Sequence, residues 1–229
     1  MNHQQEPHAK QNRDRLRQKL SLYVVTDDRA DVRDQMRVIE RALKGGATTI
    51  QLRRKDDDGR VLVELGHQIR ELTNRYQALY IVNDRVDIAL LTDADGVHVG
   101  QSDIPCRDVR KLVGDKMIGV SAGTVEEAQT AFWDGADYLG VGAIFPTSSK
   151  PDADVCGLSG LKSITSKVED IPIVAIGGIT LTNAARILSV GADGLAVVSA
   201  VMSAPNPGEA CRDLNRMIHL AVQNRRLPT

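Results

Sequence analysis

The chain is poor in aromatic residues, cysteine and net charge, and each shortage argues against a class of function. Aromatic residues make up 3% of its 229 residues, too few for rows of stacking platforms for single-stranded nucleic acid. The formal net charge of -1 offers no attraction to nucleic acid or to an anionic membrane surface. Three cysteines without a Cys-x-x-Cys pair argue against a zinc site or disulfide framework. We therefore expect a cytoplasmic protein with no nucleic-acid or membrane partner.

Long apolar runs are also missing. No stretch approaches the about 18 apolar residues that a membrane-spanning helix needs, and residues 1–20 hold no apolar block of signal-peptide length. Residues 1–20 are instead polar and basic, which predicts a disordered or loosely helical extension, with a binding arm as the second interpretation. No linker interrupts residues 21–229, so we expect them to form one domain.

From Leu22 onward, short apolar, β-branched runs alternate with charged stretches of helical spacing. Eight such runs occur, at 22–27, 48–55, 79–84, 96–100, 117–122, 138–145, 171–179 and 194–201. This alternation predicts parallel strands joined by helical crossovers. The count of eight predicts a closed (β/α)8 barrel, a TIM barrel of the α/β class. Trp133, in one helical stretch, is expected to pack between its helix and the sheet.

A weak repeat precedes several of these runs. Gly46-Ala47-Thr48, Gly135-Ala136-Asp137 and Gly191-Ala192-Asp193 each stand just before a run, and Asp93-Ala94-Asp95-Gly96 is a variant. Glycine ends a helix readily in the left-handed conformation, and alanine lets the chain turn tightly into the next strand. The repeat predicts similar joints at the N-terminal face of the barrel, where they serve stability.

Polar residues follow an alternating pattern in the second run. Gln51, Arg53 and Lys55 share one face of the strand, while Ile50 and Leu52 share the other. If the first face points inward, an amide and two cations lie at the barrel mouth, where such barrels carry their chemistry. Inward cations are costly without an anion. The pattern therefore favours an anionic ligand over a surface charge cluster.

The third and fourth runs both end near an aspartate. Asp84 follows Asn83, and Asp103 lies three residues beyond Gly100. Neighbouring strands are about 4.8 Å apart, so the two acids can converge on one ion. Mg2+ commonly takes one or two carboxylates and completes its shell with water and phosphate oxygens. The pair predicts a Mg2+ site, with helix capping as the alternative for each acid. His98 is expected to be a hydrogen-bonded core residue rather than a ligand.

The sixth run leads into a loop rich in hydroxyl groups. Gly140 and Gly142 suit a buried strand that another group approaches closely. Pro146 ends the strand, and Thr147, Ser148, Ser149 and Lys150 follow in consecutive positions. These hydroxyls and the ammonium can cradle a phosphate, although an ordinary polar loop is the simpler interpretation.

The seventh and eighth runs point to a second anion site. Phosphate sites in these barrels often lie in the loops after strands seven and eight, with backbone N–H groups and a helix N-terminus as donors. Gly177 and Gly178 end the seventh run, and Val198 and Ser199 end the eighth. We expect the glycines to let a phosphate approach the backbone closely.

Together these motifs resemble the thiamine-phosphate synthase family, from Leu22 to the C-terminus. The matching motifs, each at an expected strand end, are Gln51-x-Arg53-x-Lys55, Asn83-Asp84, Gly100-Gln101-x-Asp103, Val120-Ser121-Ala122, Phe145-Pro146-Thr147-x-Ser149-Lys150, Ile176-Gly177-Gly178-Ile179 and Val198-Ser199. Such enzymes join a pyrimidine diphosphate to a thiazole phosphate with Mg2+ and release pyrophosphate. The resemblance implies that the diphosphate leaves first and that the thiazole nitrogen attacks the resulting pyrimidine-methyl cation.

The resemblance implies a role for each matched residue. Asp84 and Asp103 would hold Mg2+, and Arg53, Lys55 and Lys150 would act in catalysis. The residues implied for the pyrimidine diphosphate are Gln51, Arg53, Lys55, Asn83, Ser121 and Lys150. The residues implied for the thiazole phosphate are Thr147, Ser149, Gly177, Gly178, Val198 and Ser199.

Two positions depart from the family pattern. Ala143 stands where the family often has Pro, and Gly123 stands where a larger residue, commonly His, is found. Two alternatives remain open: a thiazole tautomerase of the same fold, and a non-catalytic barrel that binds thiamine intermediates. The two acids and the cations favour the synthase, and Gly123 lacks the side chain that a tautomerase would use as acid or base. The sequence leaves open whether the protein is a homo-oligomer.

Overall fold

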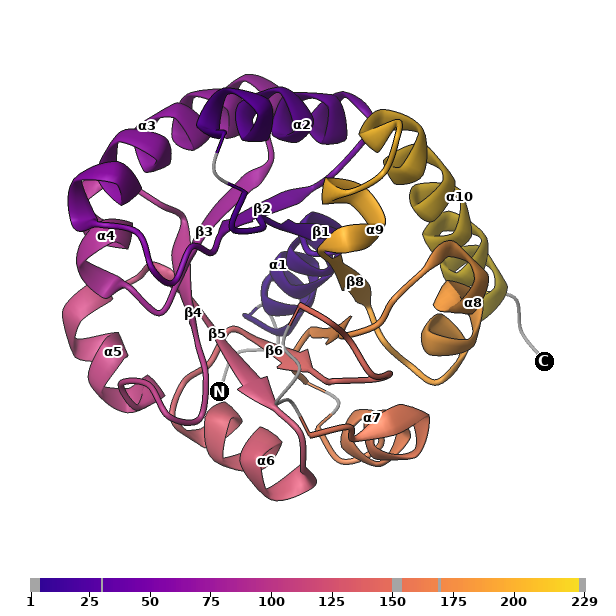
Figure 1. The fold of residues 1–229 in the computed structure, drawn as a ribbon. Helices are drawn as coiled ribbons and strands as arrows, with labels where there is room; N and C mark the ends of the chain where they lie inside the picture. Colours follow the sequence, from indigo (N-terminus) through magenta and orange to yellow (C-terminus); the bar gives the residue numbers. More distant parts are fainter. Residues whose placement is uncertain (1–4, 30, 150–153, 169, 227–229) are drawn as a thin grey trace.

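The computed structural model describes residues 5–29, 31–149, 154–168 and 170–226. In these residues eight parallel strands close into a barrel in chain order, with helices outside it (Figure 1). The strands are β1 (Leu22–Val25), β2 (Thr49–Leu52), β3 (Leu79–Asn83), β4 (Gly96–Val99), β5 (Met117–Ala122), β6 (Tyr138–Val141), β7 (Ile173–Ile176) and β8 (Gly194–Val197). The predicted single-domain (β/α)8 barrel is confirmed. Most predicted runs extend past their strand because their last residues belong to loops at the barrel mouth.

The helices that follow the strands form the outer layer. They are α2 (Val32–Lys44), α3 (Gly59–Tyr76), α4 (Val86–Leu91), α5 (Cys106–Val113), α6 (Val125–Trp133), α7 (Gly157–Thr165), α8 (Leu181–Ser189), the short α9 (Ser199–Met202) and α10 (Pro207–Arg226). Among the described residues, no helix combines the length and apolar character that a membrane span needs.

The core has two parts because strand side chains alternate between the helices and the barrel interior. Ile50 and Leu52 are 0% and 2% exposed and belong to the large cluster beneath the helices. Gln51, between them, is 4% exposed and bonds to the hydroxyl of Tyr23, a member of the smaller interior cluster. In the second strand, Gln51 thus faces the barrel interior while Ile50 and Leu52 face the helices, as the alternation predicted.

An additional helix, α1 (Gln5–Lys19), lies at the N-terminal end of the barrel. Leu16 and Leu20, one turn apart, pack against the interior cluster, and the Thr49 hydroxyl donates a 2.7 Å hydrogen bond to the carbonyl of Lys19. Figure 1 shows α1 at the centre of the ring of helices. Of the two states expected here, disordered or loosely helical, residues 5–19 show the helical one, and the two leucines cover the open end of the interior core.

Four polar side chains, Thr48, Asp95, Asp137 and Asp193, form what we call the bottom ring. Each stands just before an even-numbered strand and accepts the backbone N–H at or near the start of the preceding strand. The bonds are Leu22 N to Thr48 Oγ1 (3.0 Å), Tyr80 N to Asp95 Oδ2 (2.7 Å), Ile118 N to Asp137 Oδ2 (2.8 Å) and Ile173 N to Asp193 Oδ2 (2.9 Å). The repeat seen in the sequence therefore has a structural role at the N-terminal face.

Each of the three aspartates of the bottom ring forms an ion pair with an arginine. Arg70 lies 3.0 Å from Asp95, Arg110 lies 2.6 Å from Asp137, and Arg17 of α1 lies 3.3 Å from Asp193. Each aspartate thus joins two strands and also neutralises a cation. The third pair ties α1 to the barrel.

The prediction for Trp133 is wrong. Its side chain is 81% exposed at the end of α6 and makes an edge-on contact with Phe132. The small residues Ala128 and Ala131 are the buried ones of this helix. These small side chains let α6 lie close to the barrel. The contact between α6 and the sheet is therefore made by alanines, and the indole ring lies outside it.

Candidate active site at the C-terminal strand ends

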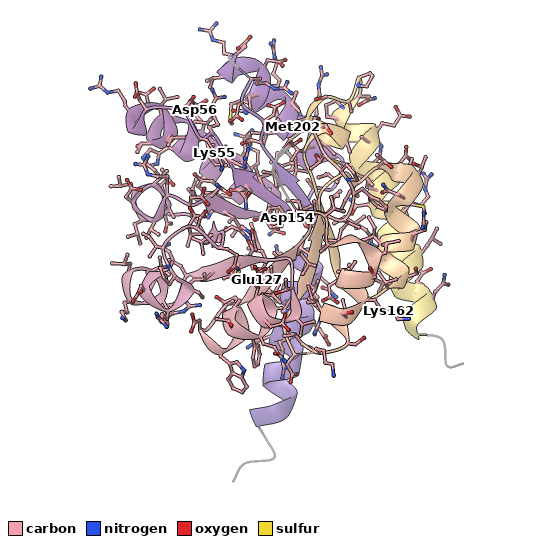
Figure 2. All side chains as sticks on the ribbon, turned by 60° about the horizontal axis from the view of Figure 1, so that its bottom comes forward. Lys55, Asp56, Glu127, Asp154, Lys162 and Met202 are labelled. Carbon is pink, nitrogen blue, oxygen red and sulfur yellow. The ribbon has the colours of Figure 1, made fainter. Side chains whose placement is uncertain are left out.

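The β2 end brings two cations to the mouth. Arg53 follows the strand, and its backbone is held by Thr26, whose Oγ1 accepts from Arg53 N (2.9 Å) and donates to Arg53 O (3.1 Å). The Arg53 side chain is 19% exposed and lies 3.9 Å from the carboxylate of Asp28. Lys55 is exposed, at the end of the barrel opposite α1 (Figure 2). Arg54 points the other way and pairs with Asp57, as the alternation predicts.

Asp84 and Asp103 meet at the ends of β3 and β4. Their carboxyl groups are close enough for Asp103 to influence the ionisation of Asp84. Burial, together with the neighbouring Asp103, raises the pKa of Asp84 to about 6, against the opposing charge of Lys55 and a hydrogen bond from Asn83. Asp103 Oδ2 also accepts from Gly100 N at 2.7 Å. The two acids therefore lie near each other at adjacent strand ends, and their role as metal ligands stays a prediction.

Helix capping does not account for this pair. The N-cap positions of α4 and α5 are Arg85 and Pro105, and no side-chain capping bond occurs at either among the described residues. Asp84 has a left-handed backbone, with φ of 59°, and its N–H donates to His98 O at 2.8 Å. The carboxyl groups are therefore placed against each other rather than against a helix end.

The donor set suits Mg2+. Two carboxyl groups in contact repel each other when both are ionised, and a divalent cation between them removes that repulsion. Among the described residues, no cluster of three or more His, Cys, Asp and Glu side chains could hold a metal. A two-carboxylate site matches the way Mg2+ binds when substrate oxygens and water supply its other ligands.

Ser121 and His98 lie inside the barrel below the acids. His98 Nε2 is 3.0 Å from Ser121 Oγ, and His98 Nδ1 is 3.1 Å from the hydroxyl of Tyr138. Burial lowers the pKa of His98 to about 4, against the charge of Asp103. His98 is thus the hydrogen-bonded core residue that the sequence predicted. The interior positions of Tyr23 and Tyr138 were not predicted, although each stands in a β-strand run.

The loop after β6 forms the opposite side of the mouth. Ser149 N donates to Thr147 Oγ1 at 3.3 Å, which folds the two residues into one turn. Lys150, expected to bind the diphosphate, lies outside the described residues. At Gly177 and Gly178 the chain itself fills the space that a side chain would take, and their predicted part in a phosphate site is not tested by this packing. A Cβ on Gly177 would lie 2.7 Å from Ala143 Cα, and one on Gly178 would lie 2.7 Å from Pro146 O.

The β8 end supplies a helix terminus. α9 begins at Ser199, with Val198 at its N-cap, and no side-chain bond among the described residues caps it. The neighbouring α8 differs, because Thr180 and Asn183 form a capping box at its first turn. The backbone donors of α9 are the ones positioned for a phosphate in barrels of this kind. Val198 and Ser199 therefore lie at the strand end expected from the sequence, and their part in binding a phosphate stays a prediction.

Gly123 leaves room beside Ser121. A Cβ on Gly123 would lie 3.6 Å from Glu127 Oε2 and 3.9 Å from Gly142 O, which are ordinary contact distances. Its backbone N–H donates to Glu127 Oε2 at 2.6 Å. A side chain would therefore fit at position 123, and the chain has none there.

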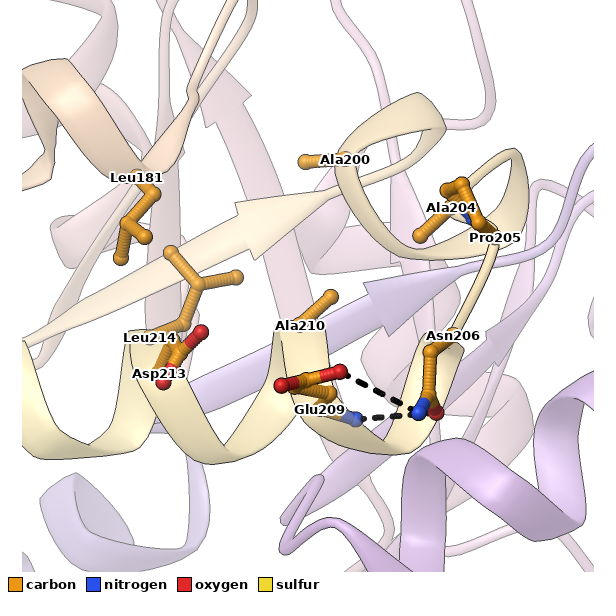
Figure 3. Close-up of a pocket in the computed structure, with 9 residues that line it drawn as sticks. All are labelled: Leu181, Ala200, Ala204, Pro205, Asn206, Glu209, Ala210, Asp213 and Leu214. Atoms are coloured by element: carbon orange, nitrogen blue, oxygen red, sulfur yellow. Dashed lines mark hydrogen bonds between the residues drawn. The ribbon is translucent and has the colours of Figure 1, made fainter.

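A groove of about 350 Å³ lies elsewhere, between α8, α9 and α10. Its walls are mainly apolar, and its charged members are Glu209 and Asp213 (Figure 3). Two acids and no cation among its lining residues disfavour an anionic ligand. The mouth, with Arg53 and Lys55, is the better site for phosphorylated substrates.

Comparisons with known proteins agree with this geometry. A family model described as thiamine monophosphate synthase matches residues 22–201. The thiamine-phosphate synthase of Moorella thermoacetica is 52% identical over 200 residues, covering 86% of this chain and 95% of the relative. That of Pyrococcus furiosus is 46% identical over 203 residues, covering 89% and 97%.

A solved structure gives the same result. The thiamine phosphate pyrophosphorylase of Pyrococcus furiosus superposes with a TM-score of 0.83 at 44% identity, covering 90% of this chain and 99% of that one. A 3-hexulose-6-phosphate synthase, at 19% identity and a TM-score of 0.65, shares the fold alone. Matched family model, close relatives and fold together show that the chain belongs to the thiamine-phosphate synthase family.

Proposed function

We propose that the barrel condenses 4-amino-2-methyl-5-(diphosphooxymethyl)pyrimidine with 4-methyl-5-(2-phosphooxyethyl)thiazole to give thiamine phosphate and pyrophosphate. The observation that carries the proposal is the contact between Asp84 and Asp103 at the mouth, with Lys55 close enough to influence the Asp84 carboxyl group. Paired acids and adjacent cations suit a leaving diphosphate better than any neutral substrate.

The diphosphate side comprises the ends of β2, β3 and β4. Asp84 and Asp103 would hold Mg2+, which when bound supplies positive charge to the departing diphosphate. Arg53 and Lys55 bind the diphosphate oxygens, and Lys150 joins them in this proposal. Their fixed charges stabilise the negative charge that develops as the carbon–oxygen bond breaks.

No covalent intermediate with the protein is needed. The three cysteines, Cys106, Cys156 and Cys211, all have thiol pKa values raised by burial, that of Cys106 to about 11. A thiol is a weak nucleophile until it ionises. The residues instead suit a dissociative substitution, in which the thiazole nitrogen captures a pyrimidine-methyl cation.

The two substrates occupy different parts of the mouth. Gln51, Asn83 and Ser121 hold the aminopyrimidine, on the side of β2 to β5. The proposed residues for the thiazole phosphate are Thr147, Ser149, Gly177, Gly178, Val198 and Ser199. Gly177 and Gly178 also let the 143–146 segment lie against the end of β7. Small phosphorylated substrates and Mg2+ are all that the reaction requires, in keeping with the cytoplasmic location expected from the sequence.

Incubation of the purified protein with both substrates and Mg2+ tests the proposal. We expect thiamine phosphate and pyrophosphate in equal amounts, and neither after chelation of the metal. Isomerisation of the thiazole without condensation would instead identify a tautomerase. Binding of both phosphates without any turnover would identify a non-catalytic thiamine-intermediate-binding barrel.

A further inference from the structure

A continuous chain of hydrogen bonds crosses the barrel interior. Gln51 Nε2 donates to the Tyr23 hydroxyl (2.8 Å), which lies 2.8 Å from the Tyr138 hydroxyl. Tyr138 lies 3.1 Å from His98 Nδ1, and His98 Nε2 lies 3.0 Å from Ser121 Oγ. The five side chains come from five different strands. We call these five residues the interior relay.

The strands make room for the interior relay with glycine. A Cβ on Gly119 would lie 2.1 Å from Tyr138 Cζ and 2.4 Å from His98 Nδ1, and one on Gly140 would lie 2.8 Å from His98 Cε1. Such distances are far below van der Waals contact, so no other residue fits at either position with these rings in place. What approaches Gly140 closely is therefore His98, not a ligand.

The protonation state of each interior group is defined. Burial raises the pKa of the Tyr23 and Tyr138 hydroxyls above the usual value, so each keeps its single hydrogen. Both ring nitrogens of His98 lie against neutral hydroxyl groups, those of Tyr138 and Ser121, and no acid bonds to the ring among the described residues. The imidazole is therefore neutral and has one donor and one acceptor nitrogen. Each interior member can then donate one hydrogen bond within the chain.

These single hydrogens fix one direction. Gln51 Nε2 only donates, so Tyr23 accepts from it, and the hydrogen of Tyr23 goes to Tyr138. Tyr138 then donates to His98 Nδ1, and His98 Nε2–H donates to Ser121. In the opposite direction Tyr23 would accept twice, and its buried hydrogen would lose its partner in the chain, which is costly.

The direction of the hydrogen bonds determines which group, donor or acceptor, Gln51 and Ser121 offer to a ligand. The amide nitrogen of Gln51 is occupied, so Gln51 offers its carbonyl oxygen as an acceptor. Ser121 Oγ already accepts from His98, so its own O–H is free to donate. A 4-aminopyrimidine has the complementary pair, an amino N–H and an unprotonated ring nitrogen. The 4-oxo form has the reverse pair, a carbonyl oxygen and a ring N–H.

We propose that Tyr23, Tyr138 and His98 are positioning residues that set Gln51 as an acceptor and Ser121 as a donor, and so select an amino- over an oxopyrimidine. The identity of the ligand rests on the proposed function, whereas the direction of the interior relay rests on the orientation of the Gln51 amide and on the single hydrogen of each interior group. A site that leaves a buried hydrogen-bonding group unpaired rejects an analogue strongly. Rejection of the oxo form would follow from fixed polarity at both ends.

The tautomer of His98 tests the direction without any substrate. In the 15N-labelled full-length protein, with the signal assigned by its loss in His98→Asn, Nε2 should carry the proton and Nδ1 should be unprotonated. The same tautomer is expected from pH 6 to pH 9. The opposite tautomer, or a mixture of both, overturns the proposal even if the protein makes thiamine phosphate.

Selectivity is tested by calorimetric binding of the 4-amino and 4-oxo pyrimidine diphosphates with Mg2+. Tyr138→Phe removes the hydroxyl that links Tyr23 to His98, and we expect the affinity ratio between the two compounds to fall about 10-fold or more. Tyr80→Phe is the matched control, because Tyr80 is also fully buried and bonds to Thr92 outside the interior relay. Its ratio should equal that of the unaltered protein.

Each outcome has a separate meaning. If Tyr138→Phe weakens both compounds equally, the hydroxyl is only structural and the proposed selection is wrong. If the unaltered protein binds the aminopyrimidine selectively but forms no thiamine phosphate, the proposed function fails and the interior relay stands. Should Tyr138→Phe not fold, the tautomer measurement on the unaltered protein still decides the direction.

Discussion

The two ends of the barrel use aspartate in opposite ways. In the bottom ring, Asp95 and Asp137 each accept a strand N–H and pair with an arginine. At the mouth, Asp84 and Asp103 lie near each other, and burial together with the neighbouring Asp103 raises the pKa of Asp84 to about 6. The bottom ring satisfies its charges within the fold, whereas the mouth acids stay in mutual repulsion above that pH until a cation binds. The comparison teaches that the same residue type stabilises one end and prepares the other for a ligand.

Asp84→Asn should have the largest effect, a loss of activity without a loss of stability. We expect kcat/KM to fall about a thousandfold, because the leaving diphosphate loses a metal ligand. Asparagine tolerates the left-handed backbone of this position. Loss of the repulsion with Asp103 should also stabilise the metal-free protein by about 1 kcal/mol, since water screens this half-buried pair. Steady-state kinetics and thermal unfolding measure the two effects.

Asp56→Asn is the control for this variant, because Asp56 is exposed on the same side of the molecule (Figure 2). It should change neither kcat/KM nor the unfolding midpoint. A loss of stability in Asp84→Asn, parallel to its loss of activity, would remove the contrast between the two ends.

Asp137→Ala should have the second largest effect, and on stability. It leaves the Ile118 N–H and the Arg110 guanidinium without their acceptor, so the free energy of unfolding should fall by about 2–3 kcal/mol. In a chain of this length that corresponds to about 4–12 °C in the unfolding midpoint. Below that midpoint, kcat/KM should be unchanged.

Asp115→Ala provides the matched comparison, because Asp115 is an exposed acid in the turn before β5. We expect less than about 0.5 kcal/mol for it. If Asp137→Ala lowers kcat/KM at a temperature where it is fully folded, the bottom ring is not purely structural.

Much of the fold followed from local patterns. Eight β-branched runs and the alternation at Gln51, Arg53 and Lys55 depend on strand geometry, which acts over a few residues. The convergence of Asp84 and Asp103 followed from adjacent strand ends. These features are predictable because neighbouring parallel strands place their C-terminal ends together.

The remaining features depend on contacts between distant segments. Leu16 and Leu20 were two apolar residues near the end of a basic stretch, and only the open barrel interior makes them a hydrophobic contact. The close approach of Pro146 to Gly178 also joins distant segments, so the local sequence does not show it. The interior relay joins residues up to 115 positions apart, so no local spacing reveals it.

A smaller change is expected when the affinity for Mg2+ is followed as a function of pH. Because the folded pKa of Asp84 is raised to about 6, the proton must leave before Mg2+ binds, and affinity should fall by up to about 10-fold for each pH unit below 6. The stability of the metal-free protein should change the other way. The contribution of Asp84 is fully present below its unfolded pKa and is lost as pH rises through about 6.

Calorimetric titration with Mg2+ from pH 5 to pH 8 measures this dependence, with Asp84→Asn as the reference. That variant lacks the titrating group, so its weak residual binding should vary far less between pH 5 and pH 6. Equal pH dependence in both proteins would mean that another group governs metal binding, and the mouth would no longer differ from the bottom ring through Asp84.

The smallest expected effect concerns Thr48, the one member of the bottom ring that is not an aspartate. Its Oγ1 accepts from Leu22 N and donates to Leu22 O, both at 3.0 Å. Thr48→Val should therefore cost about 1 kcal/mol of unfolding free energy, and Thr48→Ser, which keeps both bonds, clearly less. Thr48→Asp keeps an acceptor for Leu22 N but has no hydrogen for Leu22 O, so it should be less stable than the unaltered protein by denaturant unfolding. A more stable Thr48→Asp would show that the charge, rather than the paired bonds, sets the strength of each joint.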